Sequence, residues 1–324
     1  MSKNIANYPL VTVGIPTYNR ANSFLPKTIE SVLNQSYYNI ELIVSDNCSK
    51  DNTELLITQY NDKRIRYFKQ IENIPYNENI NFCLNKANGD YFLLLCDDDF
   101  IDKDFVDSCI RTANNKEYGM IRTGMRIIDE YGKIINERQN CVSELPVKEF
   151  FAAWFSGGKT PMHLCCTLFN TQKLQEVGGF KSKKNLFIDV VPAVLLAAKY
   201  ERLDIKDVKA SYRKHSSSMA QISSVKDWCI DSRYLLDIMI DLIDNNDKSF
   251  RRSGNLFFAN HCYRYARNIK SSIKKVDAYY TIYKSFDYSG KYFANKLIIK
   301  PIYSFMKKIM RKINPSNVKC LMDL

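Results

Sequence analysis

The chain has 324 residues, of which 45% are hydrophobic and 25% are charged. This balance is typical of a soluble globular protein with about two domains, and it argues against a disordered, collagen-like or disulfide-framework protein. The ten cysteines are scattered and form no C-x-x-C pair, which disfavours a zinc ribbon or a thioredoxin-like site and favours reduced thiols. We expect neither a secretory signal nor a transmembrane helix.

The formal net charge of +12 is unevenly distributed along the chain. Residues 248–324 carry 17 Lys or Arg against three acids, whereas the other 247 residues carry 30 basic and 32 acidic side chains. A basic segment of this kind indicates an anionic partner, either a membrane surface or a nucleic acid.

Apolar strands and helices alternate through the first hundred residues, which predicts an α/β fold with a parallel sheet covered on both faces. The expected strands are 10–15, 40–45, 64–68 and 91–95, and the expected helices are 23–34, 52–60 and 77–87. Ligands of such sheets bind beyond the carboxyl ends of the strands. Polar clusters follow three of these strands, at Pro16–Arg20, Asp46–Asp51 and Asp97–Asp99.

The acidic triplet Asp97–Asp99 directly follows the apolar run at 91–95. Adjacent carboxylates at a buried strand end repel one another, and Mg²⁺ or Mn²⁺ would offset that repulsion while binding substrate phosphates. The alternative is an exposed acidic turn that caps the next helix. Neither G-x-G-x-x-G nor G-x-x-x-x-G-K-[ST] occurs, which disfavours a dehydrogenase or a P-loop ATPase.

Three motifs together resemble the family 2 glycosyltransferases, which are inverting, nucleotide-sugar-dependent enzymes. They are Ile15–Arg20 (IPTYNR), Val44–Thr53 (VSDNCSKDNT) and Ala87–Tyr91 (ANGDY) leading into Asp97–Asp99. The resemblance covers residues 10–215 and implies the GT-A fold, a Rossmann-like mixed sheet flanked by helices.

The resemblance also implies which residues bind the sugar nucleotide. Asp46 would accept a hydrogen bond from the base, although an isolated Asp there is also typical of a helix cap or an Asx turn. The implied nucleotide-sugar contacts are Pro16, Thr17, Tyr18, Asn19, Arg20, Asp46, Asn47, Asp97, Asp98 and Arg213, and the implied metal ligands are Asp97, Asp99 and His215.

The middle of the chain supplies the implied catalytic base. We expect strands at 119–128 and 163–169 and a flexible, aromatic-bearing loop at 154–160. In the family, a Gly-Phe turn such as Gly179-Phe180 precedes a carboxylate at the start of a helix, and Asp189 holds that position here. A carboxylate can accept the proton of the attacking sugar hydroxyl. The alternative is that Asp189 only caps the helix 190–198. Many members have Glu-Asp at this point, whereas this chain has Ile188-Asp189.

The C-terminal part reads as a separate helical region. We expect domains at 1–220 and 221–324, with helices at 228–243 and 256–273 and a last, basic amphipathic helix from Pro301. Such a helix fits an anchor on anionic lipid or a helix packed on its own domain. No recognised nucleic-acid-binding motif accompanies the charge, so we expect no nucleic-acid partner.

The sequence thus favours a non-processive, metal-dependent glycosyltransferase of the cytoplasm, peripheral on the inner face of the cell membrane. Its donor would be a UDP-sugar by default and its acceptor a saccharide or lipid-linked hydroxyl, in bacterial surface polysaccharide or glycolipid synthesis. Two alternatives are a sugar nucleotidyltransferase, which shares the sheet and the metal, and an inactive membrane-docked scaffold.

Overall fold

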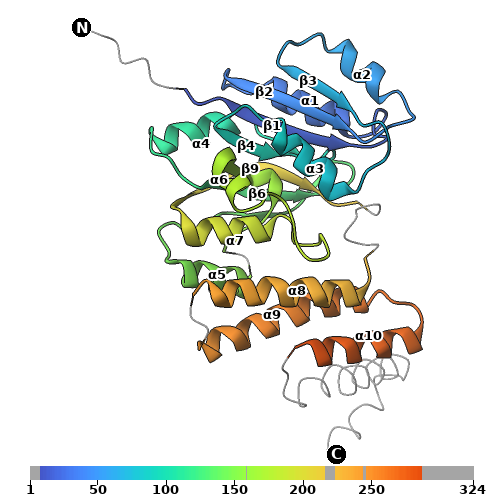
Figure 1. Ribbon diagram of the computed structural model, residues 1–324, viewed down its shortest axis with the longest axis vertical. Helices are drawn as coiled ribbons and strands as arrows, with labels where there is room; N and C mark the ends of the chain where they lie inside the picture. Colours follow the sequence, from blue (N-terminus) through green and yellow to red (C-terminus); the bar gives the residue numbers. More distant parts are fainter. Residues whose placement is uncertain (1–7, 158, 216–222, 244–245, 287–324) are drawn as a thin grey trace, which may run out of the picture.

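The protein is described by a computed structural model that covers residues 8–157, 159–215, 223–243 and 246–286 (Figure 1). The strands are β1 (Val11–Thr17), β2 (Ile40–Asp46), β3 (Ile65–Lys69), β4 (Tyr91–Leu94), β5 (Phe100–Ile101), β6 (Met120–Ile128), β7 (Ile134–Arg138), β8 (Thr167–Asn170) and β9 (Arg202–Arg213). The helices are α1 (Leu25–Leu33), α2 (Thr53–Gln59), α3 (Tyr76–Asn85), α4 (Phe105–Ala113), α5 (Val147–Ser156), α6 (Thr171–Glu176), α7 (Val190–Lys199), α8 (Val225–Asp241), α9 (Lys248–Ala266) and α10 (Ser272–Ser285), with a 3-10 turn at Leu164–Cys166.

The strands form one sheet in the order β3-β2-β1-β4-β8-β6-β9-β5, and β7 pairs with β6. The pairs β1–β2, β2–β3, β1–β4 and β6–β9 are parallel, whereas β8 runs antiparallel to both of its neighbours. The α/β class is therefore confirmed with a mixed sheet. The wholly parallel sheet that the first hundred residues suggested is extended by the antiparallel β8, which the alternating pattern did not show.

The central strands of the sheet are buried on both faces, and apolar side chains cover each face. Helices α1 and α4 pack on one face over alternate residues of β1 such as Val13. Helices α3, α5 and α7 pack on the other face around Phe92 and Phe180. Parallel alignment brings the carboxyl ends of β1, β2, β4 and β9 to one edge of the sheet, and this edge positions the candidate site.

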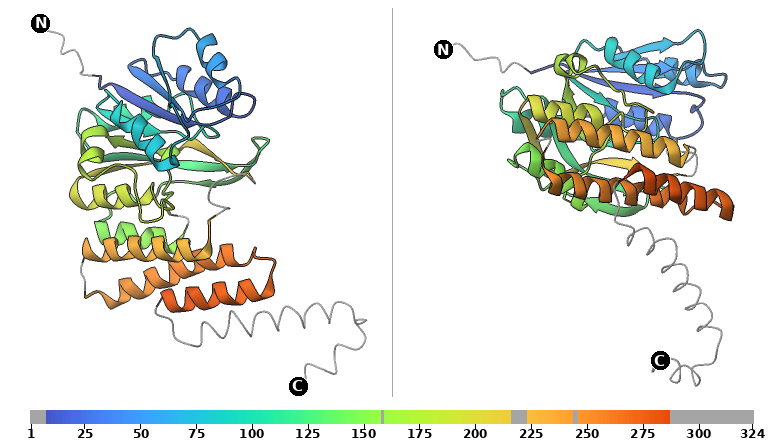
Figure 2. Two further views of the ribbon diagram at one scale, coloured as in Figure 1. Left: turned by 45° about the vertical axis from the view of Figure 1, so that its right-hand side comes forward. Right: turned by 60° about the horizontal axis from the view of Figure 1, so that its bottom comes forward.

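Helices α8, α9 and α10 form a further layer next to α5 and α7 (Figures 1 and 2). One continuous apolar cluster runs from Phe187 through Trp228 and Phe258 to Ile282. The α/β part and the helical part therefore share a core, and the boundary at residue 220 stays a prediction. No described helix combines the length and apolar character that crossing a bilayer requires.

Two local expectations were wrong. The segment 154–160 was expected to be a flexible loop, but Trp154 lies in α5 and its ring packs against Phe257 of α9 at 4.8 Å between centroids. Gly157 and Gly158 suggested a loop, but the apolar face of the preceding residues stabilises a helix. The helix expected at 256–273 is two helices, because α9 ends at Ala266 and Ser271 caps α10 by accepting from the Lys274 amide. The basic helix expected from Pro301 lies outside the described residues, so its membrane role stays a prediction.

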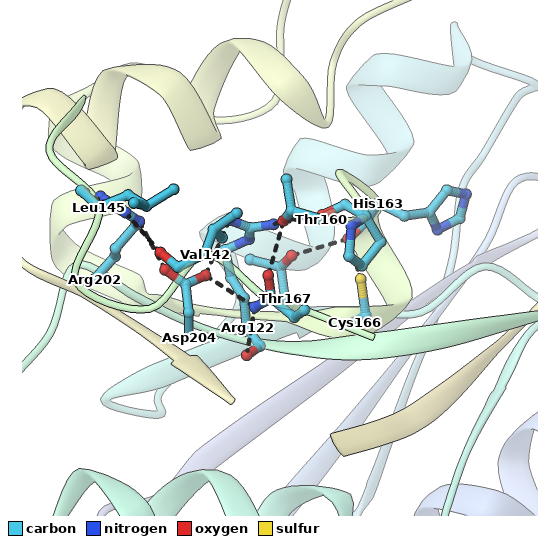
Figure 3. A network of polar contacts seen from close by, with 11 residues as sticks. Arg122, Val142, Leu145, Thr160, His163, Cys166, Thr167, Arg202 and Asp204 are labelled. Atoms are coloured by element: carbon cyan, nitrogen blue, oxygen red, sulfur yellow. Dashed lines mark hydrogen bonds and ion pairs between the residues drawn. The ribbon is translucent and has the colours of Figure 1, made fainter. Parts of the chain in front are cut away.

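A buried ion pair holds the segment that precedes β8 in place (Figure 3). The fully buried guanidinium of Arg122 pairs with the Asp204 carboxylate at 3.1 Å and also donates to the Thr160 hydroxyl and the Pro161 carbonyl. Arg202 donates to the other Asp204 oxygen at 2.8 Å. The network joins β6 and β9 to the chain that carries His163.

Asp204→Asn should lower the free energy of unfolding by about 3 kcal/mol, because it leaves the Arg122 guanidinium buried without its carboxylate. Urea unfolding monitored by circular dichroism measures this loss. Arg111→Met, which removes an exposed helix-surface pair with Asp107, should leave the unfolding midpoint unchanged. Equal stability of Asp204→Asn and the wild type would show that the buried pair contributes nothing net.

Candidate active site

A cavity of about 430 Å³ opens at the carboxyl edge of the sheet. Its walls come from the chain after β1, the end of β4, the loop before α7, the end of β9 and the first turn of α8. Among the residues expected from sequence, those that line it are Arg20, Asp97, Asp98, Asp99, Asp189, Arg213 and His215. The acidic triplet and the expected base therefore share one cavity.

Each carboxylate of the triplet has a different partner. Asp97 accepts from the Thr17 hydroxyl at 2.8 Å, and Arg20 lies 3.9 Å from its other oxygen. Asp98 lies 2.5 Å from Nε2 of His215. Burial, reinforced by the charge of Asp98, raises the pKa of Asp97 to about 6. The three side chains thus point to β1, to the segment after β9 and to β9 itself.

Asp99 is the most deeply buried of the three, with 1% of its surface exposed. One oxygen accepts from the Arg213 amide at 2.8 Å, and the other has no hydrogen-bond partner among the described residues. Burial and the neighbouring Asp98 charge raise the pKa of Asp99 well above its usual value. An unpartnered buried carboxylate oxygen is costly, and it fits a site that a cation completes.

Arg213 supports the backbone turn that carries the acidic triplet. Its guanidinium donates to the carbonyl oxygens of Asp98, Asp129 and Glu130 at 2.9–3.2 Å, and it lies over the Phe24 ring at 4.3 Å. Only 3% of the residue is exposed. In this arrangement its hydrogen bonds shape the turn that carries the acids, and its expected contact with substrate phosphate stays a prediction.

Oxygen and imidazole ligands around the triplet fit a hard divalent cation such as Mn²⁺. Asp98, Asp99 and Cys96 offer ligand atoms within 4.8 Å of one another. His215 adjoins Asp98 at 2.5 Å. The carboxylate of the expected ligand Asp97 contacts Thr17 and lies 3.9 Å from Arg20. Which of Asp97, Asp98, Asp99 and His215 would hold a metal stays a prediction.

The expected nucleoside residues lie beside this cavity and are largely engaged within the protein. The Asp46 side chain is fully buried, and it accepts from the Ser49 amide and the Tyr67 hydroxyl. Asn47 exchanges two hydrogen bonds of 2.8 Å with the backbone of Ile74. These contacts hold the β2 loop in shape, so the contact of Asp46 with a base stays a prediction.

The β1 loop is tied to the β2 loop. Asn19, with φ of 54°, donates its amide to the Ser49 hydroxyl and accepts from the Lys50 amide, both at 2.8 Å. Tyr18 is 42% exposed, and Pro16 pairs with Ser45 within the sheet. Of this loop, Arg20 reaches the cavity.

Asp189 is presented to the cavity by a fixed turn and a helix start. Gly178 and Gly179 have φ of 93° and 69°, which favours glycine at both positions. Phe180 is then pinned by two hydrogen bonds to the Asn81 amide group. Asp189 caps α7 by accepting from the Val190 amide at 2.9 Å, and its second oxygen has no partner from another residue in the described chain. Burial raises the pKa of Asp189 to about 7, to which the Asp231 charge contributes.

Asp231 was missed by the sequence analysis, yet it organises the loop before Asp189. This fully buried carboxylate on α8 accepts from the Ser182 hydroxyl and from the amides of Lys184, Leu186 and Phe187 at 2.7–3.1 Å. Four donors converge on this one carboxylate and fix the loop. A single Asp within an amphipathic helix carries no motif, so nothing in the sequence indicated it.

His163 was also missed. It lines the cavity, its ring centroid lies 4.3 Å from that of Tyr212, and burial lowers its pKa to about 4. The imidazole is therefore neutral near pH 7. It shares a cluster of possible ligand atoms with Asp99 and Cys165. The sequence around His163 has the pattern of an apolar strand, so it gave no indication that this residue lies at the site.

Sequence comparison identifies the family. The profile of "Glycosyl transferase family 2" matches residues 12–178, just over half of the chain. The chain belongs to this family.

A Campylobacter jejuni protein named GalNAc(5)-diNAcBac-PP-undecaprenol beta-1,3-glucosyltransferase is 33% identical over 156 residues, which are 46% of this chain and 50% of that protein. An uncharacterized glycosyltransferase of Rickettsia bellii is 38% identical over 132 residues, which are 40% of this chain and 19% of that protein. The chain thus matches half or less of the length of these relatives.

Solved structures confirm the GT-A fold. S. aureus TarS 1-349 in complex with UDP-GlcNAc superposes with a TM-score of 0.66 at 15% identity, over 86% of this chain and 82% of that one. The mannosyltransferase PcManGT of Pyrobaculum calidifontis, in complex with GDP-Man and Mn²⁺, has a TM-score of 0.52 at 16% identity over the same shares of the two chains. Family membership favours the glycosyltransferase interpretation over the nucleotidyltransferase alternative.

Asp231→Ala should loosen the loop before Asp189, because the amides of Lys184, Leu186 and Phe187 lose their common acceptor. Hydrogen-deuterium exchange should show faster exchange in a peptide that spans residues 182–188, with little change in the central strands. Asp237→Ala, an exposed Asp on the same helix, is the matched control. Unchanged protection of this peptide in Asp231→Ala would refute the positioning role.

Proposed function

We propose that the protein is an inverting, non-processive glycosyltransferase that moves one sugar from a nucleoside-diphosphate sugar to a hydroxyl of its acceptor. The observation that carries this proposal is the shared cavity, which Asp189 lines together with the acidic triplet and His215. A base and a diphosphate site in one cavity are the two elements that such a transfer needs.

The donor and acceptor classes follow from family membership and the matched proteins. TarS and PcManGT are described with UDP-GlcNAc and GDP-Man, which supports a nucleoside-diphosphate sugar as donor, with UDP as the default nucleotide. The C. jejuni relative is named for a lipid-linked saccharide acceptor. We therefore propose a saccharide or lipid-linked acceptor in bacterial surface polysaccharide or glycolipid synthesis.

In the proposed reaction, the acceptor oxygen attacks the anomeric carbon of the donor while the bond from that carbon to the diphosphate oxygen breaks. Asp189 accepts the hydroxyl proton on the carboxylate oxygen that is not engaged with the Val190 amide. Its pKa of about 7 suits this task, because a base is most effective when its pKa lies near the working pH. Attack from the face opposite the leaving group inverts the anomeric carbon.

The leaving diphosphate needs positive charge around it. Asp98, Asp99 and His215 would hold a divalent cation, which supplies charge stabilisation to the diphosphate when bound. Arg20 lines the same cavity and can donate to phosphate oxygens. Asp97 accepts from the Thr17 hydroxyl and lies 3.9 Å from Arg20, and so helps to position the Arg20 guanidinium.

Asp189→Asn should lower kcat by about 10²–10⁴-fold, because the amide cannot accept the proton. In the wild type, kcat should rise with pH through about pH 7 and then level, because the working form of Asp189 is the ionised one. Release of nucleoside diphosphate from the donor measures both effects. Donor affinity should be unchanged in the variant, and Asp237→Asn should behave as the wild type. A pH-independent kcat between pH 5.5 and 8.5 would contradict the assignment.

Asp98→Ala and His215→Ala should each weaken Mn²⁺ binding by about tenfold or more, because each removes a proposed ligand. Electron paramagnetic resonance of free Mn²⁺, recorded with UDP present, measures this affinity without relying on turnover. Asp207→Asn, which removes an exposed acid on β9, should not change it. Full Mn²⁺ affinity in both ligand variants would refute the metal site.

A thermal-shift panel of nucleoside diphosphates and their sugars, with and without Mn²⁺, tests the donor class. A ligand that binds the native state alone raises the unfolding temperature with concentration. We expect a shift with one base and its sugar derivative that grows with Mn²⁺. The absence of any shift across the panel would refute the proposed donor class.

A further inference from the structure

A second cavity, of about 770 Å³, adjoins the catalytic cavity. It lies at one end of the helical layer, where α8 and α10 begin and α9 ends (Figure 1). Tyr212 and Ser223 line both cavities. The rings of Trp228, which lines the first, and Tyr265, which lines the second, stack at 4.5 Å between centroids and 13° between planes. A ligand in the second cavity is therefore a direct neighbour of one in the first.

The second cavity is strongly cationic. Lys214, Lys226, Arg264 and Lys274 line it from four separate segments, against one lining acid, Asp277. In the described part of the chain, none of these four side chains forms an ion pair or a hydrogen bond with another residue. Several other lysines of the protein, in contrast, form ion pairs with carboxylates.

All four side chains are exposed to solvent, and together they make the cavity electropositive, which favours an anionic ligand. A guanidinium and several ammonium groups are the side chains that bind phosphate oxygens. In the proposed function, the donor diphosphate binds at the acidic triplet in the first cavity, and Tyr212 lies in the wall that the two cavities share. The cationic cavity is thus left for a different anion that reaches the site together with the donor.

We propose that this cavity binds a phosphate or diphosphate group carried by the acceptor, while the hydroxyl of the same acceptor enters the catalytic cavity beside Asp189. The inference rests on the proposed function and specifies its acceptor as an anionic one. The phosphate holds the acceptor in the helical layer, and the shared wall of Tyr212 and Ser223 sets the direction in which its sugar reaches the base.

The test is isothermal titration calorimetry on the full chain in EDTA, with inorganic pyrophosphate and geranyl diphosphate as probes. EDTA removes the metal on which diphosphate binding at the donor site depends. The triple variant Lys226→Ala, Arg264→Ala, Lys274→Ala should bind the probe at least tenfold more weakly than the wild type. Lys214 is left in place because it adjoins His215.

The matched control is Arg267→Ala, Lys270→Ala, Lys275→Ala, which removes the same charge from α10 and from the connection that precedes it, but from residues that do not line the cavity. The control should retain wild-type affinity, and circular dichroism should show both triple variants folded. Tighter binding of geranyl diphosphate than of pyrophosphate would show that the lipid chain contributes to binding and would identify a lipid-linked diphosphate as the ligand. Equal binding of the two probes would show that the protein recognises the diphosphate group alone.

Equal losses in both triple variants, or no loss in either, would overturn the inference, as would a wild type that binds neither probe. These outcomes are separable from failure of the proposed function. Nucleoside diphosphate binding with Mn²⁺, measured on the same wild-type preparation, reports on the donor site alone. Donor binding without a cavity-specific loss refutes the anionic acceptor, whereas absence of donor binding refutes the proposed function.

Discussion

The site depends on three adjacent carboxylates that the end of β4 brings into a buried position. Their mutual repulsion is unfavourable in the folded state unless neighbouring groups oppose it. The end of β9 supplies that opposition, because the Arg213 amide binds Asp99, the Arg213 guanidinium binds the Asp98 carbonyl and His215 adjoins the Asp98 carboxylate. One oxygen of Asp99 still lacks a partner in the described structure. The protein thus offsets part of the repulsion and leaves the rest to a cation in the proposed function.

The helical layer is part of the site, because it orders the loop that carries the proposed base. Asp231 lies on α8, yet its four hydrogen bonds go to the loop between Phe180 and Asp189. The same carboxylate contributes to the raised pKa of Asp189. The shared apolar cluster through Trp228 and Phe258 makes α8 a rigid support. Removal of the helical layer would therefore be expected to disorder the base as well as to expose the core.

Much of the sheet edge was predictable, whereas the pairing of its side chains was not. An apolar strand followed by acids fixes the position of Asp97–Asp99 at the carboxyl edge. Successive side chains of the turn then point in different directions, so Asp97 faces Thr17, Asp98 faces His215 and Asp99 faces Arg213. Sequence spacing carries no information on this choice. Asp231 was unpredictable for a related reason, because its partners are backbone amides of a distant loop. β9 was not predicted, because charged residues interrupt its apolar pattern. This strand nevertheless carries Arg213, and its pairing with β6 positions that residue.

The arrangement of the two cavities bears on how donor and acceptor reach each other. The acidic triplet and Arg20 follow sheet strands, whereas Asp189 precedes α7 and Trp228 lies on α8. Three of the four cations of the second cavity lie on α8, α9 and α10. A donor held at the sheet edge and an acceptor held by the helices would meet across the catalytic cavity from different sides. In the proposed function, that approach would place the acceptor hydroxyl away from the leaving diphosphate, which is the geometry that inversion needs. Under the proposed function, acceptor choice in this chain is therefore expected to lie in α8, α9 and α10.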